Sequence, residues 1–282
     1  MKIKNVNHAD IKINTELTAP GKKIRIVHKE TQRHQNIFFG AVAVLFILAL
    51  FFIEVDYNGI LQGFDRLPSV IKELSQISFE NFGTLAFGML TTLTIAFLAV
   101  LISLIISFPI SFIVAYNVTP NKFIGTIFRY ATMLIRSIPT PIWVLIAVAS
   151  LGFGPMAGII GLLFPTTSFF VKAFAAQIEE EGSDVIEAIR SVGGTWWHVV
   201  IKGLLPVLFT GLIATIGVRF ELDVHESVIL GIVGAGGIGY LLQSYIQYYQ
   251  FGDLTLGILM VFVTIFTLEL VINLIRLRIG DR

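Results

Sequence analysis

The sequence lacks cysteine and has few charged residues for its 282-residue length. Without a thiol, disulfides, thiolate catalysis and cysteine–zinc sites are excluded. Charged residues make up 14% of the chain, whereas soluble domains carry about 25%. Hydrophobic residues make up 55%, and the mean hydropathy is +0.82, which is more apolar surface than a soluble protein of this size could bury. Composition therefore favours a polytopic membrane protein, and a formal net charge of only +1 argues against a nucleic-acid partner.

Motifs for nucleotide and metal chemistry are also missing. The sequence contains no Walker A motif, no HExxH motif and no nucleophile elbow, and its five histidines are scattered. We therefore expect no catalytic residue, metal site or cofactor on this chain. A membrane-anchored redox enzyme would need a nucleotide-binding domain, and no polar block is large enough to form one.

Six apolar segments are long enough to cross a bilayer as helices, which takes about 17–25 residues. They predict an all-α polytopic protein with six transmembrane helices at about 37–54, 85–116, 127–150, 155–176, 205–232 and 254–275. Residues 1–36 are polar and basic with no early apolar run, so we expect no secretory signal there.

The placement of Lys and Arg predicts the orientation. Loops rich in these residues stay in the cytoplasm, so the basic tail and the basic end of the chain are expected there. The acid-rich connector then lies outside. The predicted organisation is a cytoplasmic tail, a first transmembrane helix, an external connector, a five-helix core and a second cytoplasmic tail, at 1–36, 37–54, 55–84, 85–276 and 277–282.

The segment 179–205 is too polar to cross a membrane and too long for a simple turn. Ser183 is expected to cap a short helix whose apolar positions recur at helical spacing. Gly193-Gly194 would end that helix, and a second short helix would cover about 196–201. Two amphipathic helices on the cytoplasmic face would form a docking surface for a partner. Alternatively, they would lie on lipid headgroups.

This segment resembles the EAA loop of ABC-importer permeases. The family pattern reads E-A-A, three residues, G, nine residues, I, one residue, L-P, and it is met at Glu187, Ala188, Gly193, Leu205 and Pro206. Two positions depart from it, because Ile189 replaces the second Ala and Gly203 replaces the Ile. The resemblance implies that this segment is the coupling helix that fits a cleft in an ATPase subunit.

Three longer motifs resemble the phosphonate-importer permease family. They are RSIPTPIW at 136–143, GFGP at 152–155 followed by Ala157-Gly158, and RFE at 219–221 running on to VILGIVGAGGIG at 228–239. Together they cover most of residues 85–276, whereas the first 84 residues carry no matching motif. The resemblance implies a type I ABC-importer (MetI-like) core of five helices.

The same resemblance implies the partners and the function. Two permease copies would pair in the inner membrane of a prokaryote, two ATP-binding-cassette ATPase subunits would hold ATP and Mg, and an external binding protein would deliver substrate. Phosphonate is the leading substrate class; phosphite, phosphate and other small solutes such as amino acids stay open. A secondary transporter is the rival class, but it should show repeated halves, and the sequence shows no such repeat.

A glycine cluster follows the fifth predicted span. Gly234, Gly236, Gly237 and Gly239 satisfy G-x-G-x-x-G, yet a dinucleotide site would need a surrounding βαβ unit, and another apolar span follows instead. We expect a break or kink here. Glycines at such a break either allow helices to pack closely or line the transport pathway.

Several ionisable residues lie inside predicted spans. Arg219 follows Pro206 by 13 residues, or roughly 20 Å of helix, so it lies at membrane depth. Spacing of four residues predicts the pairs Arg219–Asp223 and Glu221–His225. Two interpretations stay open for this group: internal salt bridges, or a polar gate or pathway for an oxyanion. The members are Arg219, Glu221, Asp223, His225 and Glu226.

Arg136 lies in the third predicted span, just before Pro139 and Pro141. Its side chain would either reach the cytoplasmic headgroups or contact the pathway.

Overall fold

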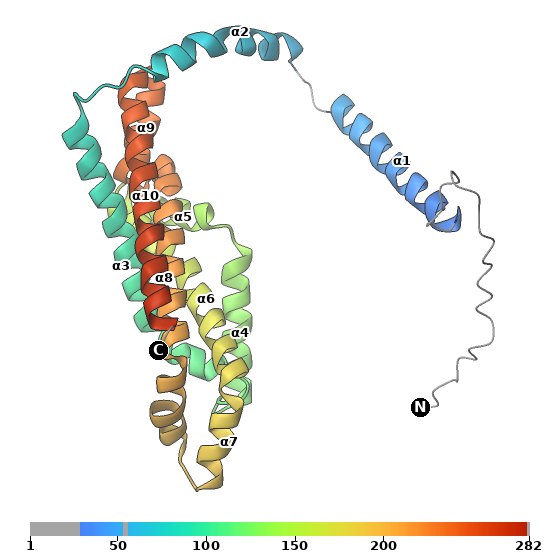
Figure 1. Ribbon diagram of the computed structural model, residues 1–282, viewed down its shortest axis with the longest axis vertical. Coiled ribbons are helices and arrows are strands. Elements are labelled where there is room, and N and C mark those ends of the chain that lie inside the picture. The colour runs from blue at the N-terminus through green and yellow to red at the C-terminus, as the bar shows by residue number, and fades with distance from the viewer. Residues whose placement is uncertain (1–28, 53–55, 281–282) are drawn as a thin grey trace, which may run out of the picture. The chain divides into compact units, whose positions relative to one another are not determined.

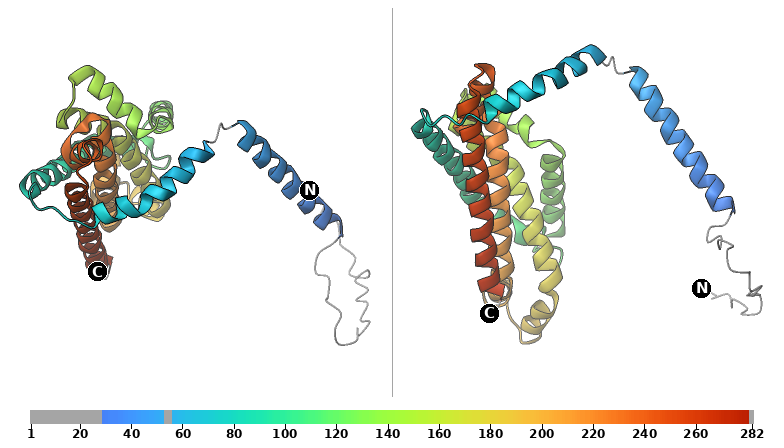
Figure 2. Two further views of the ribbon diagram at one scale, coloured as in Figure 1. Left: turned by 90° about the horizontal axis from the view of Figure 1, so that it is seen from above. Right: turned by 45° about the horizontal axis from the view of Figure 1, so that its top comes forward.

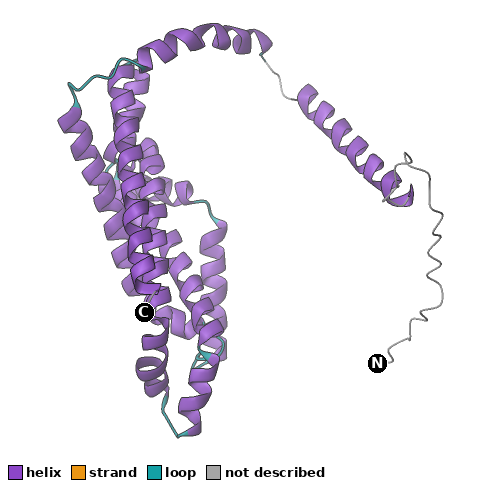
Figure 3. Cartoon of the chain, in the orientation of Figure 1, coloured by secondary structure: helices purple, strands orange, loops and turns teal. Residues whose placement is uncertain are grey.

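The computed structural model describes residues 29–52 and 56–280, and the predictions for residues 1–28, 53–55 and 281–282 lie outside that part. The chain divides into two compact units, Met1–Asp65 and Arg66–Arg282. Figure 3 shows helices and connecting loops throughout the described residues, so the predicted all-α class is confirmed. In the first unit, α1 (Lys29–Phe52) is apolar enough to span a membrane.

The predicted connector contains an unpredicted helix, α2 (Tyr57–Leu74), which runs across the boundary between the two units. Its large apolar side chains recur on one face, and its charged residues lie between them. This amphipathic pattern is typical of helices that lie along a membrane surface. Its four charged residues, Asp65, Arg66, Lys72 and Glu73, make α2 too polar to span a membrane.

Four long helices build the second unit: α3 (Phe82–Val114), α6 (Pro155–Glu181), α8 (Leu205–Leu230) and α10 (Phe251–Gly280). They lie side by side along the bundle (Figures 1 and 2), with the most extensive packing between α3 and α6. Buried apolar side chains such as Leu85, Phe170 and Leu208 fill the space between them. All four are long and apolar enough to cross a membrane.

The prediction of a single continuous helix at 127–150 is wrong. Two helices, α4 (Lys122–Ser137) and α5 (Thr140–Leu151), meet there at 88°. Pro139 disfavours the helical conformation of the residue before it, and Ile138 is extended with ψ of 122°. The Trp143 indole N–H donates to the Ile135 carbonyl at 3.3 Å, which satisfies one of the carbonyls at the end of α4.

The segment after α6 also differs from prediction. Helix α7 (Ser183–Ser191) is present, but Gly182 precedes it as the cap, and the Ser183 hydroxyl bonds to Asp184 at 3.3 Å instead. The prediction of a separate second helix is wrong as well, because a π-helical turn, η1 (His198–Leu204), continues into α8. Pro206 is the second residue of α8, at the point where the π-helical turn passes into the α-helix.

Candidate functional site

Arg219 lies in a buried network of charges between α8 and α6. Its Nη2 is 2.6 Å from Asp223 Oδ1 and 3.3 Å from Glu226 Oε2. The hydroxyl of Thr166 on α6 lies 2.8 Å from Asp223 Oδ2 and accepts from Arg219 at 3.0 Å. Arg219 is 6% exposed and Asp223 0%. The predicted Arg219–Asp223 pair therefore forms, and Thr166 joins it to a second helix that sequence spacing could not identify.

The predicted Glu221–His225 contact is wrong. Within the described residues, no hydrogen bond or ion pair joins these two side chains, although they are one turn apart on α8. His225 is exposed and Glu221 is half-buried. Helical spacing permits such a contact but does not require it.

The glycine cluster forms the predicted break between α8 and the short helix α9 (Gly237–Gln247). Three of its glycines have positive φ angles, 114° at Gly234, 77° at Gly236 and 72° at Gly237. The Ile238 N–H donates to the Thr92 hydroxyl of α3 at 2.9 Å, which anchors the start of α9. The cluster runs from a π-helical turn into α9, whereas a dinucleotide site would follow the end of a strand.

Gly239 allows α9 to pack closely against the end of α8. A Cβ at this position would collide with the Val228 carbonyl oxygen and would lie 3.1 Å from the Gly231 Cα. The absence of a side chain at Gly239 and at Gly231 thus lets the two backbone segments touch.

Helix α7 and the following turn lie at the end of the bundle opposite α9, as Figure 1 shows. Gly193 has a φ of 79°, and a Cβ built on it would meet no atom within 4 Å. Glu187 and Ala188 are exposed, as are Val192 at 83% and Trp197 at 66%. We call these five residues the docking surface. Exposed apolar side chains beside a charge are typical of a surface that binds a partner.

Leu205 and Pro206, the other two residues of the predicted coupling motif, lie apart from the docking surface. Both belong to the first turn of α8, where Leu205 packs against the buried core. Buried Ile186 and Leu204 hold the segment from beneath. The Trp196 indole donates to the Val118 carbonyl at 2.9 Å, a contact to the loop before α4 that sequence reasoning missed.

The two departures from the EAA pattern compensate each other in space. A Cβ on Gly203 would lie 2.5 Å from Ile189 Cδ1 and 2.8 Å from Val185 Cγ1. The large side chain that replaces alanine on α7 therefore occupies the space left by the glycine that replaces isoleucine on η1.

Gly203→Ala should lower the free energy of unfolding by about 1–3 kcal/mol, because the added methyl overpacks this contact. Ile189→Ala should offset part of that loss in the double variant. The thermal unfolding midpoints of the wild type, both single variants and the double variant form a cycle that measures this coupling. Strictly additive effects would contradict the compensation.

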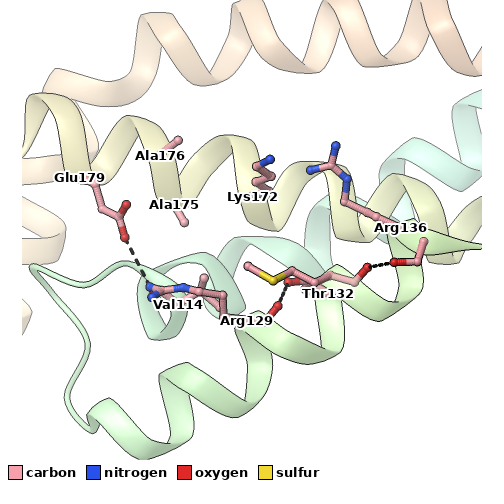
Figure 4. A pocket seen from close by; sticks show the side chains of 10 residues that line it. Val114, Arg129, Thr132, Arg136, Lys172, Ala175, Ala176 and Glu179 are labelled. Atoms are coloured by element: carbon pink, nitrogen blue, oxygen red, sulfur yellow. Dashed lines mark hydrogen bonds and ion pairs between the residues drawn. The ribbon is translucent and has the colours of Figure 1, made fainter.

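A pocket of about 500 Å³ opens between α4 and α6 (Figure 4). Its charged lining residues are Arg129, Arg136, Lys172 and Glu179, of which only Arg136 was predicted as a candidate. Arg129 and Glu179 form an ion pair at 3.5 Å. The members recur seven residues apart, at 129 and 136 on α4 and at 172 and 179 on α6. This spacing of two helical turns is visible in the sequence and could have identified all four residues.

These features define a polytopic bundle of membrane-spanning helices with an exposed helical docking surface at one end and a basic pocket along its side. The chain belongs to the family of binding-protein-dependent transport system inner membrane components, whose pattern matches residues 107–282. The predicted permease class is confirmed by this membership.

Two relatives and one solved structure show how far the similarity extends. The phosphate-import permease protein PhnE of Mycolicibacterium smegmatis is 34% identical over 203 residues, which are 71% of this chain but only 38% of that protein. The putative phosphite transport system permease protein HtxC of Stutzerimonas stutzeri is 27% identical and is covered at 91% of its length by 90% of this chain. An inward-facing structure of the MetNI methionine ABC transporter superposes with a TM-score of 0.63 at 20% identity, covering 72% of this chain and 99% of that chain. The predicted MetI-like core is confirmed as a fold.

Proposed function

We propose that this chain is the permease subunit of an ABC importer that carries a phosphorus oxyanion, phosphonate in the first place, across the inner membrane. The observation that carries the proposal is the docking surface on a fold shared with an ABC transporter. Two copies of the chain pair, and two ATPase subunits dock on their α7 ends, which face the cytoplasm together with both termini. An extracytoplasmic binding protein delivers the substrate at the α9 end.

The substrate class is supported by the names of the relatives, which are permeases for phosphate and phosphite. ATP-driven closure of the ATPases switches the permease between outward-facing and inward-facing states. Each α7 transmits that movement through Ile186 and Leu204, because these buried side chains join the docking surface to the bundle core.

Copurification with the ATPase tests the docking surface. Glu187→Lys should reduce the ATPase recovered with a tagged permease by about tenfold or more, because loss of a buried charged contact costs about 2–5 kcal/mol. Gly193→Val should act in the same direction, because a β-branched residue is strained at a φ of 79°. Glu80→Lys is the matched control, since it makes the same charge change on an exposed residue outside α7.

ATPase recovery at the wild-type level with both α7 variants would contradict the docking role. Uptake by the complete importer, measured with radiolabelled phosphate, phosphite, methylphosphonate and methionine, tests the substrate class. Uptake of methionine alone would identify an amino-acid permease, and uptake that persists without the ATPase would exclude an ABC importer.

A further inference from the structure

The basic pocket between α4 and α6 has the dimensions of a small-molecule site. Its volume of about 500 Å³ falls within the range of roughly 300–1,000 Å³ that such sites occupy. Apolar and small residues such as Val114 and Ala176 form much of the wall. The pocket thus joins an apolar lining to a few charged groups, which is the usual composition of a ligand site.

One end of the pocket is occupied by an ion pair between its own residues. Glu179 pairs with Arg129 at 3.5 Å and accepts the Tyr116 backbone N–H at 2.7 Å. The Arg129 guanidinium also donates to the Val114 carbonyl and lies over the Tyr116 ring. Because the carboxylate and the arginine neutralise each other, this end has no net charge to offer a ligand.

The other end carries two positive charges without a counter-charge. Figure 4 shows Arg136 and Lys172 together at this end, on the side away from Glu179. Within the described part of the chain, neither side chain forms an ion pair. The hydroxyls of Thr132 and Ser137 donate to backbone carbonyls, so the free donors here belong to Arg136 and Lys172.

Lys172 lies within α6, a membrane-spanning helix, and Arg136 lies in the last turn of α4, which packs against α6. Lys172 precedes the end of α6 at Glu181 by nine residues, or about 14 Å of helix. Charged groups at such positions are costly and face protein cavities or partners. Two like charges beside one pocket repel each other, and a bound dianion removes that repulsion. A planar guanidinium and an ammonium are the groups that proteins use to hold phosphate oxygens.

We propose that Arg136 and Lys172 bind a tetrahedral phosphorus oxyanion in transit through the permease. This site rests on the proposed function and names the residues that hold the substrate between the binding protein and the cytoplasm. The Arg129–Glu179 pair closes the pocket at the end nearer α7 and limits how far the anion moves before the transporter switches state.

Chemical labelling of Lys172 tests the site in the complete wild-type importer. The complex is placed in nanodiscs of phosphatidylcholine and treated with an amine-reactive ester, and the labelled fraction of Lys172 is measured by mass spectrometry. Inorganic phosphate and methylphosphonate should each lower this fraction severalfold relative to chloride at equal ionic strength. Labelling of Lys122, which lies at the start of α4 outside the pocket, should not change.

The same measurement separates a transported anion from a lipid headgroup or a protein carboxylate. Protection by phosphatidylglycerol without phosphate would overturn the proposal in favour of a headgroup site. Constant low labelling that no anion alters would overturn it in favour of a pairing with a partner carboxylate. Because both measurements use the wild-type protein, they do not depend on whether a variant folds.

Uptake by variants provides the second test. Arg136→Gln and Lys172→Met should each reduce phosphorus-oxyanion uptake about tenfold or more, as loss of a charged hydrogen bond does. Arg136→Lys and Lys172→Arg should recover a substantial part of it, and Lys122→Met is the control for charge loss on α4. Wild-type uptake by the double Arg136→Gln/Lys172→Met variant would overturn the site and leave the proposed function intact. Failure of the wild-type importer to carry any phosphorus oxyanion would instead defeat the proposed function.

Discussion

Replacing Arg219 with methionine is expected to lower the free energy of unfolding by about 3–5 kcal/mol, the cost of breaking a buried ion pair from one side. Methionine keeps most of the length of the side chain but removes the N–H groups that donate to Asp223 and Glu226. The Asp223 carboxylate is completely buried and would keep only the Thr166 hydroxyl as a partner. An unpaired charge at this depth is one of the few single changes that destabilise a protein so strongly.

The thermal unfolding midpoint of the purified permease in detergent measures this loss. The double variant Arg219→Met/Asp223→Leu should regain much of the stability, because replacing both charges with apolar side chains removes the uncompensated one. Glu221→Gln is the matched control on α8, since Glu221 has no ion pair within the described residues and its loss should change stability by about 0.5 kcal/mol or less.

The same variants separate the two interpretations of this charged group. A structural network predicts that uptake falls in proportion to the loss of folded permease and returns in the double variant. A pathway role predicts that Arg219→Met retains the wild-type unfolding midpoint but loses uptake. Unchanged stability together with unchanged uptake would contradict both interpretations.

The spanning helices were predictable because their signal is local. A run of apolar residues at membrane length leaves few options other than a helix, since backbone groups in lipid must bond within the segment. The bend at Ile138-Pro139 was not predicted, although the proline is visible in the sequence. A proline within an apolar run fits either a kinked span or two separate helices, and α2 with Pro68 and α3 with Pro109 continue through theirs. Packing around the α4–α5 junction decides between these outcomes.

The charged sites also combine residues that the local sequence predicts with residues that only tertiary packing brings together. The Arg219–Asp223 pair was predictable, because both residues lie one turn apart on a single helix. Thr166 was not, since only the packing of α6 against α8 brings it to that pair. The basic pocket also depends on two helices, because Arg129 and Arg136 lie on α4 whereas Lys172 and Glu179 lie on α6. The local sequence therefore identified part of each site, and tertiary contacts supplied the rest.

The second large effect is expected from Gly239→Ala, which should lower the free energy of unfolding by about 3 kcal/mol, the upper range for overpacking. The added Cβ would meet the Val228 carbonyl oxygen and would lie 3.0 Å from the Val228 carbonyl carbon and 3.1 Å from the Gly231 Cα. All three are backbone atoms, so no side-chain rotation relieves the clash. Helix α9 would have to move away from α8, which would disturb the Ile238–Thr92 hydrogen bond at its start.

The amount of monodisperse permease on size-exclusion chromatography and its thermal unfolding midpoint measure the effect. Gly83→Ala is the matched control, because this glycine lies in the first turn of α3 and a Cβ there meets no atom within 4 Å. That variant should be neutral or stabilised by a few tenths of a kcal/mol, as alanine favours helix. The comparison also decides between the two roles of the glycine cluster. If the glycine serves close packing, Gly239→Ala should lower the thermal unfolding midpoint. If it only lines the pathway, the variant should fold normally and show slower uptake.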